Sequence, residues 1–377
     1  MTAPIGYFVH HQGRGHAERA AAIAHGLPAD RPISFFTARA DIFPALPAHA
    51  RVVTIPSLFE PGFPTMPVFA DDRTPDTLHC APLGWDTITT AVAIIASWFD
   101  TARPALFVTD VSAELAQLAR IASVPHVAVL QHGDRSDPGH MAAYEGAVGI
   151  LAPYHASLEQ PGRPAWMNAK THYAPGVGID AQGPDRAAAR AALGLPLDAD
   201  IVLAVGGGGG SGTPATPLTL GARGEPDSLW ISIGEIQHEW HATPPANLRH
   251  MGWVANPERW IAAADRIVSS AGNTTVHMIA AAGRPWVVVP EWRYFDEQLW
   301  KARMLRAAGA AAMLDHWPSH VPAWRAAWAA AAACDLDRQR RLVDPDAAAG
   351  VAAWLDRLAG WREALPATSL LVSERIA

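Results

Sequence analysis

Short apolar strand patterns alternate with helical patterns along most of this chain, and this alternation constrains its fold more than any other feature. "IGYFV" at residues 5–9 leads into the helical pattern "HAERAAAIAHGL", and "ISFFTA" follows as the next strand. "ALFVTD", "HVAVLQ" and "VGILAP" continue the series. Strands that alternate with crossover helices form parallel sheets with helices on both faces. The sequence therefore predicts an α/β fold.

The alternation is interrupted once, near the middle of the chain. Residues 160–180, "QPGRPAWMNAKTHYAPGVGID", show no clean period, and the pattern restarts with "DADIVLAVGGGGGSG". A chain of 377 residues is comfortable for two domains. We expect two doubly wound, Rossmann-like domains that face a cleft, with ligands outside the carboxyl ends of the strands. We assign residues 1–165 to the first domain and 175–344 to the second, and expect a helix within 345–370 to pack back onto the first.

Composition narrows the classes of partner and compartment. The formal net charge is -7, and only two lysines are present, so we expect no nucleic-acid partner. Cys80 and Cys334 make neither a disulfide framework nor a zinc set, which fits a reducing cytoplasm. No signal-peptide pattern and no apolar run of membrane-spanning length is visible. We therefore expect a cytoplasmic protein without a transmembrane segment.

The turn after the first strand carries the first candidate for catalysis. In "HHQGRGHAERA", residues 10–20, Gly13 and Gly15 let the backbone turn sharply and approach a ligand. The G-x-G is incomplete as a dinucleotide fingerprint, because a third glycine and a suitable acidic residue are missing. His16 falls in the first helical turn, where it can act as a general base or simply cap or pack locally.

Asp110 ends the apolar strand of "FVTDVSAELA" at the edge where ligands bind. A plain N-cap for the next helix is one interpretation. In the other, Asp110 lies beside His16 across neighbouring strand ends. There, its carboxylate would fix the tautomer of the ring and stabilise the imidazolium.

The loop "QHGDRSDPGH", residues 131–140, collects several polar side chains after a strand. Its His and Asp residues make a metal site conceivable, but their spacing matches no strong ligand pattern. A polar substrate-binding loop and a solvated turn both remain open.

Two segments of the second half have features of phosphate-binding sites. "AVGGGGGSG", residues 204–212, follows a strand but lacks the Lys-Ser/Thr of a P-loop, so its backbone either approaches a diphosphate or serves as a linker. "SSAGNTTVHMIAAAGRPWVVVP", residues 269–290, has the pattern of a βαβ unit. We expect a tight turn at Gly272, a side-chain N-cap within residues 273–275, and a helix N-terminus that suits a phosphate. An ordinary, well-capped turn is the alternative.

The segment "GWVANPERWIAAADRIVSSAGNTTVHMIAAAGRPWVVVPEWRYFDEQLWKARMLRAAGAAAML", residues 252–314, resembles the C-terminal domain of GT-B glycosyltransferases, especially the MurG-like family and its relatives in family 1. "GRGH" at residues 13–16 resembles the first glycine loop of that family. "VTD", with Asp110, resembles the strand end that supplies an aspartate partner to the histidine in family 1.

This resemblance implies an inverting transfer of sugar, without cofactor or metal, from a nucleotide diphosphate sugar to a small-molecule or lipid-linked acceptor. The nucleotide is expected to be UDP. His16 would be the base, oriented by Asp110. The expected donor contacts are Gly207, Ser211, Trp253, Val254, Ser270, Gly272, Asn273, Thr274, Thr275, Glu297 and Gln298. The expected acceptor contacts are Gly13, Arg14, Gly15, His132 and Arg135.

One position departs from the family pattern. Met278 stands where the family normally has a glutamate that binds the ribose hydroxyls, and His277 lies about 100° away around the helix. The donor is then bound differently, carries another nucleotide, or the site has lost activity. A hydrolysing sugar-nucleotide epimerase and a non-catalytic nucleotide-sugar binder are the alternative functions.

Overall fold

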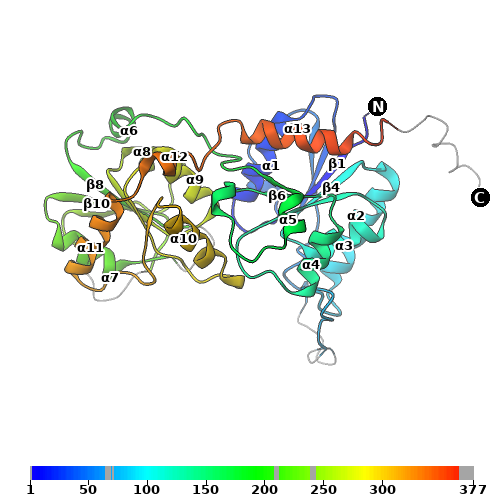
Figure 1. Ribbon diagram of the computed structural model, residues 1–377, viewed down its shortest axis with the longest axis horizontal. Coiled ribbons are helices and arrows are strands. Elements are labelled where there is room, and N and C mark those ends of the chain that lie inside the picture. Colours follow the sequence, from blue (N-terminus) through cyan, green and yellow to red (C-terminus); the bar gives the residue numbers. More distant parts are fainter. Residues whose placement is uncertain (1, 64–68, 70–71, 208–211, 238–242, 365–377) are drawn as a thin grey trace, which may run out of the picture.

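The computed structural model describes residues 2–364 apart from 64–68, 70–71, 208–211 and 238–242. Two parallel sheets, each covered by helices, lie side by side (Figure 1). The α/β class and the two Rossmann-like units that the sequence predicted are confirmed.

The first sheet has seven strands in the order β3-β2-β1-β4-β5-β6-β7, all parallel. Its strands are β1 (Ile5–Phe8), β2 (Ile33–Thr37), β3 (Ala50–Thr54), β4 (Leu106–Asp110), β5 (His126–Val129), β6 (Gly149–Ala152) and β7 (Thr171–Tyr173). The helices of this half are α1 (Gly15–Gly26), α2 (Asp86–Ala102), α3 (Ala113–Ile121), α4 (Pro138–Gly146) and α5 (Ala165–Ala169), with short 3-10 turns η1 (Ala40–Ile42) and η3 (Ala156–Leu158). The central strands are buried throughout, as expected for a sheet covered on both faces.

The second sheet has six strands in the order β12-β10-β8-β13-β14-β15. They are β8 (Asp200–Val205), β10 (Ser228–Ile233), β12 (Leu248–His250), β13 (Arg266–Ser269), β14 (Trp286–Val288) and β15 (Ala312–Met313), and a separate pair is formed by β9 (Thr213–Pro214) and β11 (Ile236–Gln237). The remaining helices are α6 (Arg186–Leu193), α7 (Ala215–Gly224), α8 (Pro257–Ala263), α9 (Asn273–Ala282), α10 (Glu297–Ala307), α11 (Val321–Ala332), α12 (Leu336–Arg340) and α13 (Ala347–Ala359), with the 3-10 turn η4 (Tyr294–Asp296).

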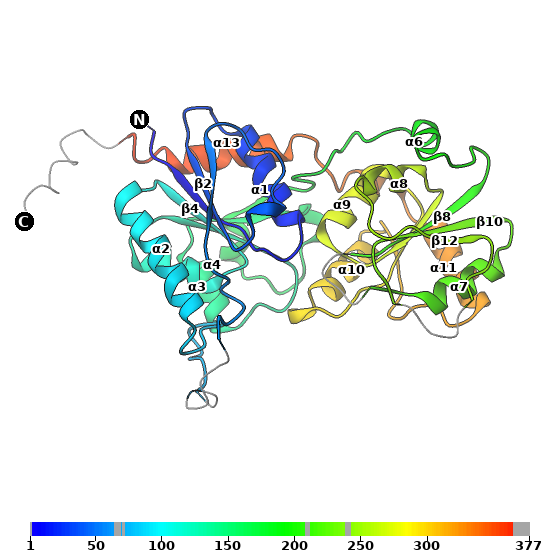
Figure 2. The same cartoon turned by 180° about the vertical axis from the view of Figure 1, so that it is seen from behind.

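The last described helix, α13, returns to the first half and packs against α1 (Figures 1 and 2). Its buried side chains, such as Val351 and Leu355, join the apolar cluster under β1 and β2. Gly26 of α1 lies so close that a Cβ there would come within 2.9 Å of Ala352. The chain therefore crosses between the two halves twice, which ties them together covalently at two points.

The two halves also share buried apolar side chains. One continuous cluster includes Tyr154 and Leu158 from the first half with Val276 and Leu305 from the second. Helix α10 contacts η3 across this boundary. Burial of apolar area at the junction favours a fixed arrangement of the two halves.

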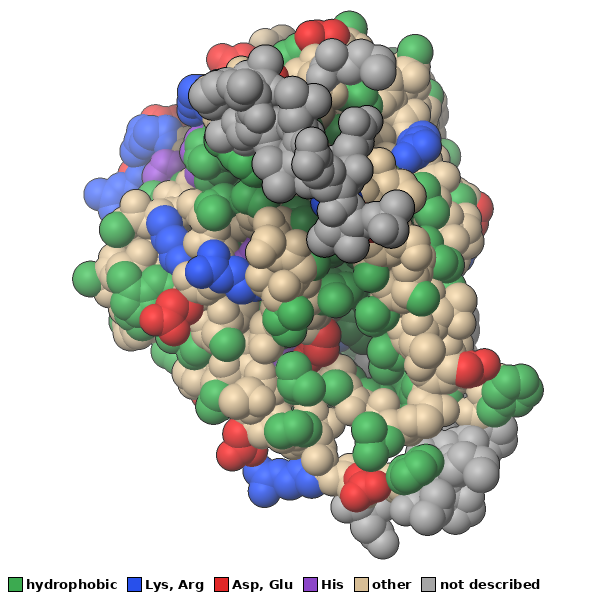
Figure 3. Space-filling model, turned by 90° about the vertical axis from the view of Figure 1, so that its right-hand side faces the viewer, with side chains coloured by type: hydrophobic (Ala, Val, Ile, Leu, Met, Phe, Trp, Pro, Cys, Tyr) green, Lys and Arg blue, Asp and Glu red, His purple; other side chains and the backbone are tan. Residues whose placement is uncertain are grey.

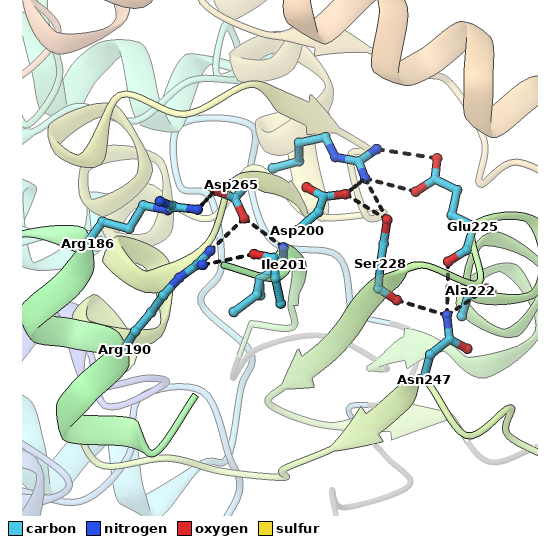
Figure 4. Close-up of polar contacts among 11 residues, drawn as sticks. Arg186, Arg190, Asp200, Ile201, Ala222, Glu225, Ser228, Asn247 and Asp265 are labelled. Carbon is cyan, nitrogen blue, oxygen red and sulfur yellow. Dashed lines mark hydrogen bonds and ion pairs between the residues drawn. The ribbon is translucent and has the colours of Figure 1, made fainter. Parts of the chain in front are cut away.

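A polar network stabilises the amino ends of the second sheet (Figure 4). The fully buried Arg190 pairs with Asp265 at 2.6 Å and also donates to the carbonyl oxygens of Leu197, Ala199 and Ala263. Arg266 pairs with Asp200 and, at 3.0 Å, with Glu225. The amino end is the edge opposite the expected ligand site, so we interpret this network as structural.

The segment without a clean period, residues 160–180, contains regular structure. It includes α5 and β7, and β7 is the last strand of the first sheet. Its burial is intermediate along its whole length, as is usual at a sheet edge, so it lacks the apolar run that marks the other strands.

Among the described residues, no helix combines the length and the apolar character needed to cross a bilayer. Figure 3 looks onto the end of the molecule formed by the first half, where the visible Lys and Arg side chains occur in small groups between uncharged ones.

Candidate functional site

His16 and Asp110 meet at the carboxyl ends of β1 and β4. These strands are neighbours in register, with Phe8 opposite Thr109, so the turn after β1 and the end of β4 lie side by side. Nδ1 of His16 is 3.0 Å from Oδ2 of Asp110. Asp110 is fully buried, while the His16 side chain keeps 20% of its surface exposed.

Neither of these two side chains serves as a helix cap. Ser112 rather than Asp110 caps α3, because its hydroxyl accepts the N–H of Leu115. Arg14 occupies the N-cap position of α1, and His16 is not its cap. The pairing of the two side chains therefore does not follow from helix capping.

Arg19, which no motif of the sequence indicated, joins this pair. Its guanidinium Nη2 is 2.5 Å from Oδ2 of Asp110 and 3.1 Å from Nδ1 of His16. Arg19 follows His16 by three residues, which puts both on one face of α1. That spacing was visible in "HAER", but nothing in the sequence indicated that the face points to Asp110.

Burial and charge decide the protonation of this cluster. Burial alone would raise the pKa of Asp110, but the Arg19 guanidinium and the His16 ring lower it well below its ordinary value. Burial, with Asp110, raises the pKa of the Tyr7 phenol, so that group stays neutral. Burial also lowers the pKa of the His10 ring, whose centroid is 5.5 Å from that of His16, to about 3. Asp110 and Arg19 are thus the permanently charged groups of the cluster.

The N-terminus of α9 faces the same place from the second half. A Cβ on Gly15 would lie 2.4 Å from Oγ1 of Thr274, so the first turns of α1 and α9 touch. Helix N-termini carry a partial positive charge and N–H groups without intrahelical partners. The arrangement therefore brings a candidate base and a candidate anion-binding site together in one place.

The local details of α9 differ from those we expected. Gly272 itself takes the N-cap position, and no side chain of the described residues caps the helix there. Its φ is -62°, so the glycine is not needed for a left-handed turn. An added Cβ would meet only Thr275 Oγ1 at 3.8 Å. Asn273 is engaged elsewhere, because its Nδ2 donates to the carbonyl oxygen of Pro153 and its Oδ1 accepts from Lys301.

Lys301 is a second residue that the sequence analysis did not single out. It is 1% exposed, and its Nζ lies 3.2 Å from Asn273 Oδ1 and 3.7 Å from Glu297 Oε1. Burial lowers the pKa of Lys301, and the Glu297 carboxylate opposes that shift. The four-residue spacing from Glu297 was the available signal.

The loop at residues 131–140 contacts the second half, and its residues Gln131, Arg135 and His140 also line a small pocket beside the end of β4. His132 is 0% exposed, with Nε2 2.7 Å from the carbonyl oxygen of Leu158. Arg135 is buried, pairs with Glu297 at 3.3 Å and stacks over the ring of Phe295. The expected acceptor roles of His132 and Arg135 stay predictions. Of the other expected acceptor contacts, Gly13 has a φ of 83°, and Arg14 pairs with Glu18 at 3.8 Å.

The remaining residues expected to contact the sugar donor differ in their solvent exposure. Gln298 is buried, and its Oε1 accepts the backbone N–H groups of Ala271 and Glu291, so this oxygen holds two loops together. Trp253 is 65% exposed, whereas Val254 packs against the apolar core. Ser270 is buried, and Gly207 is close enough that a Cβ there would lie 3.6 Å from its hydroxyl. Ser211 lies outside the described residues.

His277 and Met278 have different surroundings. The ring of His277 is buried, and burial, with the cations Lys301 and Arg19, lowers its pKa to about 3. Met278 is half-buried and packs against the shared apolar cluster. His277 therefore points toward the junction and does not replace the missing glutamate.

One group of described residues has the composition of a metal site. Ligand atoms of His79, Asp137 and His140 lie within 4.8 Å of one another. Asp137 already caps α4 through the N–H of His140 and also meets its ring at 2.6 Å. The Arg135 guanidinium, 3.4 Å from the other ring nitrogen of His140, opposes a bound cation. We interpret this group as the capping of α4.

Comparison with solved structures supports the fold. The glycotransferase of kitacinnamycin superposes with a TM-score of 0.63 at 17% identity, and the match covers 95% of this chain and 100% of that one. MurG of Acinetobacter baumannii gives 0.57 at 14% identity, with the same shares covered. The chain has the GT-B fold. The resemblance found in the sequence is thereby confirmed, and in a GT-B protein the site described above lies between the two Rossmann-like units.

Sequence comparison gives a narrower match. The chain is 30% identical over 146 residues to the UDP-N-acetylglucosamine--N-acetylmuramyl-(pentapeptide) pyrophosphoryl-undecaprenol N-acetylglucosamine transferases of Yersinia pseudotuberculosis and Yersinia pestis. That match covers 36% of this GT-B chain and only 41% of the length of those relatives. No family model matches the chain.

Proposed function

We propose that this chain is an inverting glycosyltransferase that moves a sugar from a UDP-linked donor to a hydroxyl group of a small-molecule or lipid-linked acceptor. The sequence relatives are named as transferases of a UDP-linked sugar, which supports the donor class. The GT-B fold is consistent with a donor in the second half and an acceptor in the first.

One observation carries the proposal. A hydrogen-bonded His16–Asp110 pair sits at the carboxyl ends of two neighbouring parallel strands, and the N-terminus of α9 meets the same turn through Thr274. Transfer of a sugar from a diphosphate requires a base for the acceptor and a site that stabilises the departing anion.

The reaction follows from these roles. Nδ1 of His16 donates to Asp110, which leaves Nε2 free to take the proton of the acceptor hydroxyl. The acceptor oxygen bonds to the anomeric carbon as the bond between that carbon and the diphosphate oxygen breaks, and attack from the opposite face inverts the configuration. The N–H groups at the start of α9 stabilise the charge of the departing diphosphate.

Turnover with UDP-sugars and a panel of hydroxylated acceptors tests the proposal. His16→Ala should lower turnover by about 10²–10⁴-fold, the usual contribution of a general base, with donor affinity nearly unchanged. His25→Ala, on the last turn of α1, is the matched control and should keep full turnover. Full turnover of His16→Ala with a hydroxyl acceptor would exclude His16 as the base.

A non-catalytic nucleotide-sugar binder is the second candidate, and specific contacts favour it. Met278 stands where the resemblance implies a glutamate that binds the ribose, and Glu297, expected to bind the sugar, is held by Arg135 and Lys301. A thermal-shift screen with UDP, GDP, TDP and their sugars distinguishes the two candidates. Stabilisation by a nucleotide sugar, without turnover of any acceptor, would support the binder.

A further inference from the structure

We infer that Arg19 is a positioning residue that competes with His16 for one carboxylate oxygen of Asp110 and thereby limits the basicity of His16. The inference rests on the proposed function, in which His16 is the base. It concerns how that base is tuned and adds a residue that the family pattern did not indicate.

Three atoms form this hydrogen-bonded cluster. Oδ2 of Asp110, Nη2 of Arg19 and Nδ1 of His16 make a triangle with sides of 2.5, 3.0 and 3.1 Å. The other carboxylate oxygen, Oδ1, has no hydrogen-bond partner among the described residues. Both donors thus converge on one oxygen although a second oxygen is nearby.

The triangle sets two opposing hydrogen bonds at Nδ1. When Nδ1 carries its proton it donates to Asp110, and Nε2 then has the lone pair that accepts a proton. When Nδ1 is bare it can accept from Arg19, and Nε2 is then protonated and cannot act as a base. Asp110 favours the productive tautomer and Arg19 the unproductive one.

Charge acts in the same sense. Arg19 and Asp110 are both buried, and together they carry no net charge. A plain aspartate partner would favour the imidazolium, but here the guanidinium offsets much of that effect because it is equally close. Of the other titratable groups nearby, burial keeps Tyr7, His10 and His277 neutral at physiological pH. Lys301, another cation, also acts on Arg19, and the Glu297 carboxylate lies 3.7 Å from its Nζ.

The test is the titration of the His16 ring, followed by NMR in the full-length protein without substrate. Arg19→Gln keeps an N–H donor for Asp110 but removes the charge, so the titration midpoint should rise by about 1 pH unit. Arg19→Lys keeps the charge and should leave the midpoint within about 0.3 unit of the native value. Arg338→Gln, an exposed site on α12, is the control for a distant charge change.

A double variant keeps the test decisive if Arg19→Gln does not fold. Asp110→Asn should lower the midpoint by at least about 1 unit, because the Arg19 charge is then unopposed. Asp110→Asn combined with Arg19→Gln buries no charge and should return the midpoint to near the native value. A merely structural role for Arg19 would not produce this restoration.

Two outcomes separate this inference from the proposed function. In an active enzyme, Arg19→Gln should move the acid limb of the kcat/KM profile up by about 1 pH unit, in step with the NMR midpoint. A native protein without turnover would overturn the proposed function, while the titration still decides the role of Arg19. A midpoint that is unchanged or lower in Arg19→Gln would overturn this inference.

Discussion

The close approach of α1 and α9 can be tested without any substrate. A methyl group added by Gly15→Ala would lie 2.4 Å from Oγ1 of Thr274, a distance at which one of the two groups must move. Overpacking of this kind costs about 1–3 kcal/mol. Alanine in place of glycine in a helix contributes about 0.5–1 kcal/mol in the opposite direction. We therefore expect Gly15→Ala to lie between neutral and about 2.5 kcal/mol destabilising.

The contact partner provides the decisive comparison. In a Thr274→Ala background the clashing oxygen is absent, so Gly15→Ala should stabilise by about 0.5–1 kcal/mol. The double-mutant cycle should then give a coupling energy of about 1–3 kcal/mol between the two positions. Gly350→Ala in α13 is the matched control, because a Cβ there meets nothing within 4 Å. Gly350→Ala should therefore show only the stabilisation of about 0.5–1 kcal/mol that alanine gives over glycine inside a helix.

Urea unfolding followed by tryptophan fluorescence measures the unfolding free energy of each of the four proteins in the cycle. Where the two halves unfold in separate transitions, the free energies of those transitions are added. The clash can also be relieved by opening the junction, so the free energy of the junction sets the upper limit of the coupling. If Gly15→Ala has the same effect with and without the Thr274 side chain, the two helix N-termini do not meet as described.

Three further predictions concern other parts of the molecule. Met278→Glu should strengthen binding of a ribonucleoside diphosphate by up to about 10-fold and a 2′,3′-dideoxy analogue little, because a ribose hydroxyl gains a partner; equal gains by calorimetry would mean that the ribose lies elsewhere. Arg190→Met should cost about 1–3 kcal/mol in the free energy of unfolding, because buried carbonyl oxygens lose their donor, while the partly exposed Asp265 keeps its pair with Arg186. The exposed Arg338→Met should change it by less than about 0.5 kcal/mol, and similar values for both would contradict the network in Figure 4. Burial lowers the pKa of His277 to about 3, against about 6.5 in the unfolded chain. The contribution of this ring to the free energy of unfolding is therefore complete above about pH 6.5 and is lost as the pH falls toward about 3. His277→Asn should therefore reduce the acid slope of the unfolding free energy by up to about 1.4 kcal/mol per pH unit, and an unchanged slope would show that this ring is not buried neutral.

The sequence by itself determined the α/β class and the two-sheet plan, because strand and helix periodicity are local signals that burial on two faces makes strong. It also indicated that His16 and Asp110 lie together, since His16 follows one strand, Asp110 ends another, and the carboxyl ends of parallel strands share one edge. It failed at β7, whose half-buried edge position leaves no apolar run to read.

Only the tertiary structure decided which of the polar residues face one another. Arg19 shares Asp110 with His16 because the rotation of α1 about its axis is set by packing against the sheet and α13. Arg135 and Glu297, which are 162 residues apart, pair because the two halves dock through a shared apolar cluster. Periodicity and motif spacing describe one segment at a time, whereas contacts across a domain junction depend on shape complementarity between segments, and no local pattern encodes that.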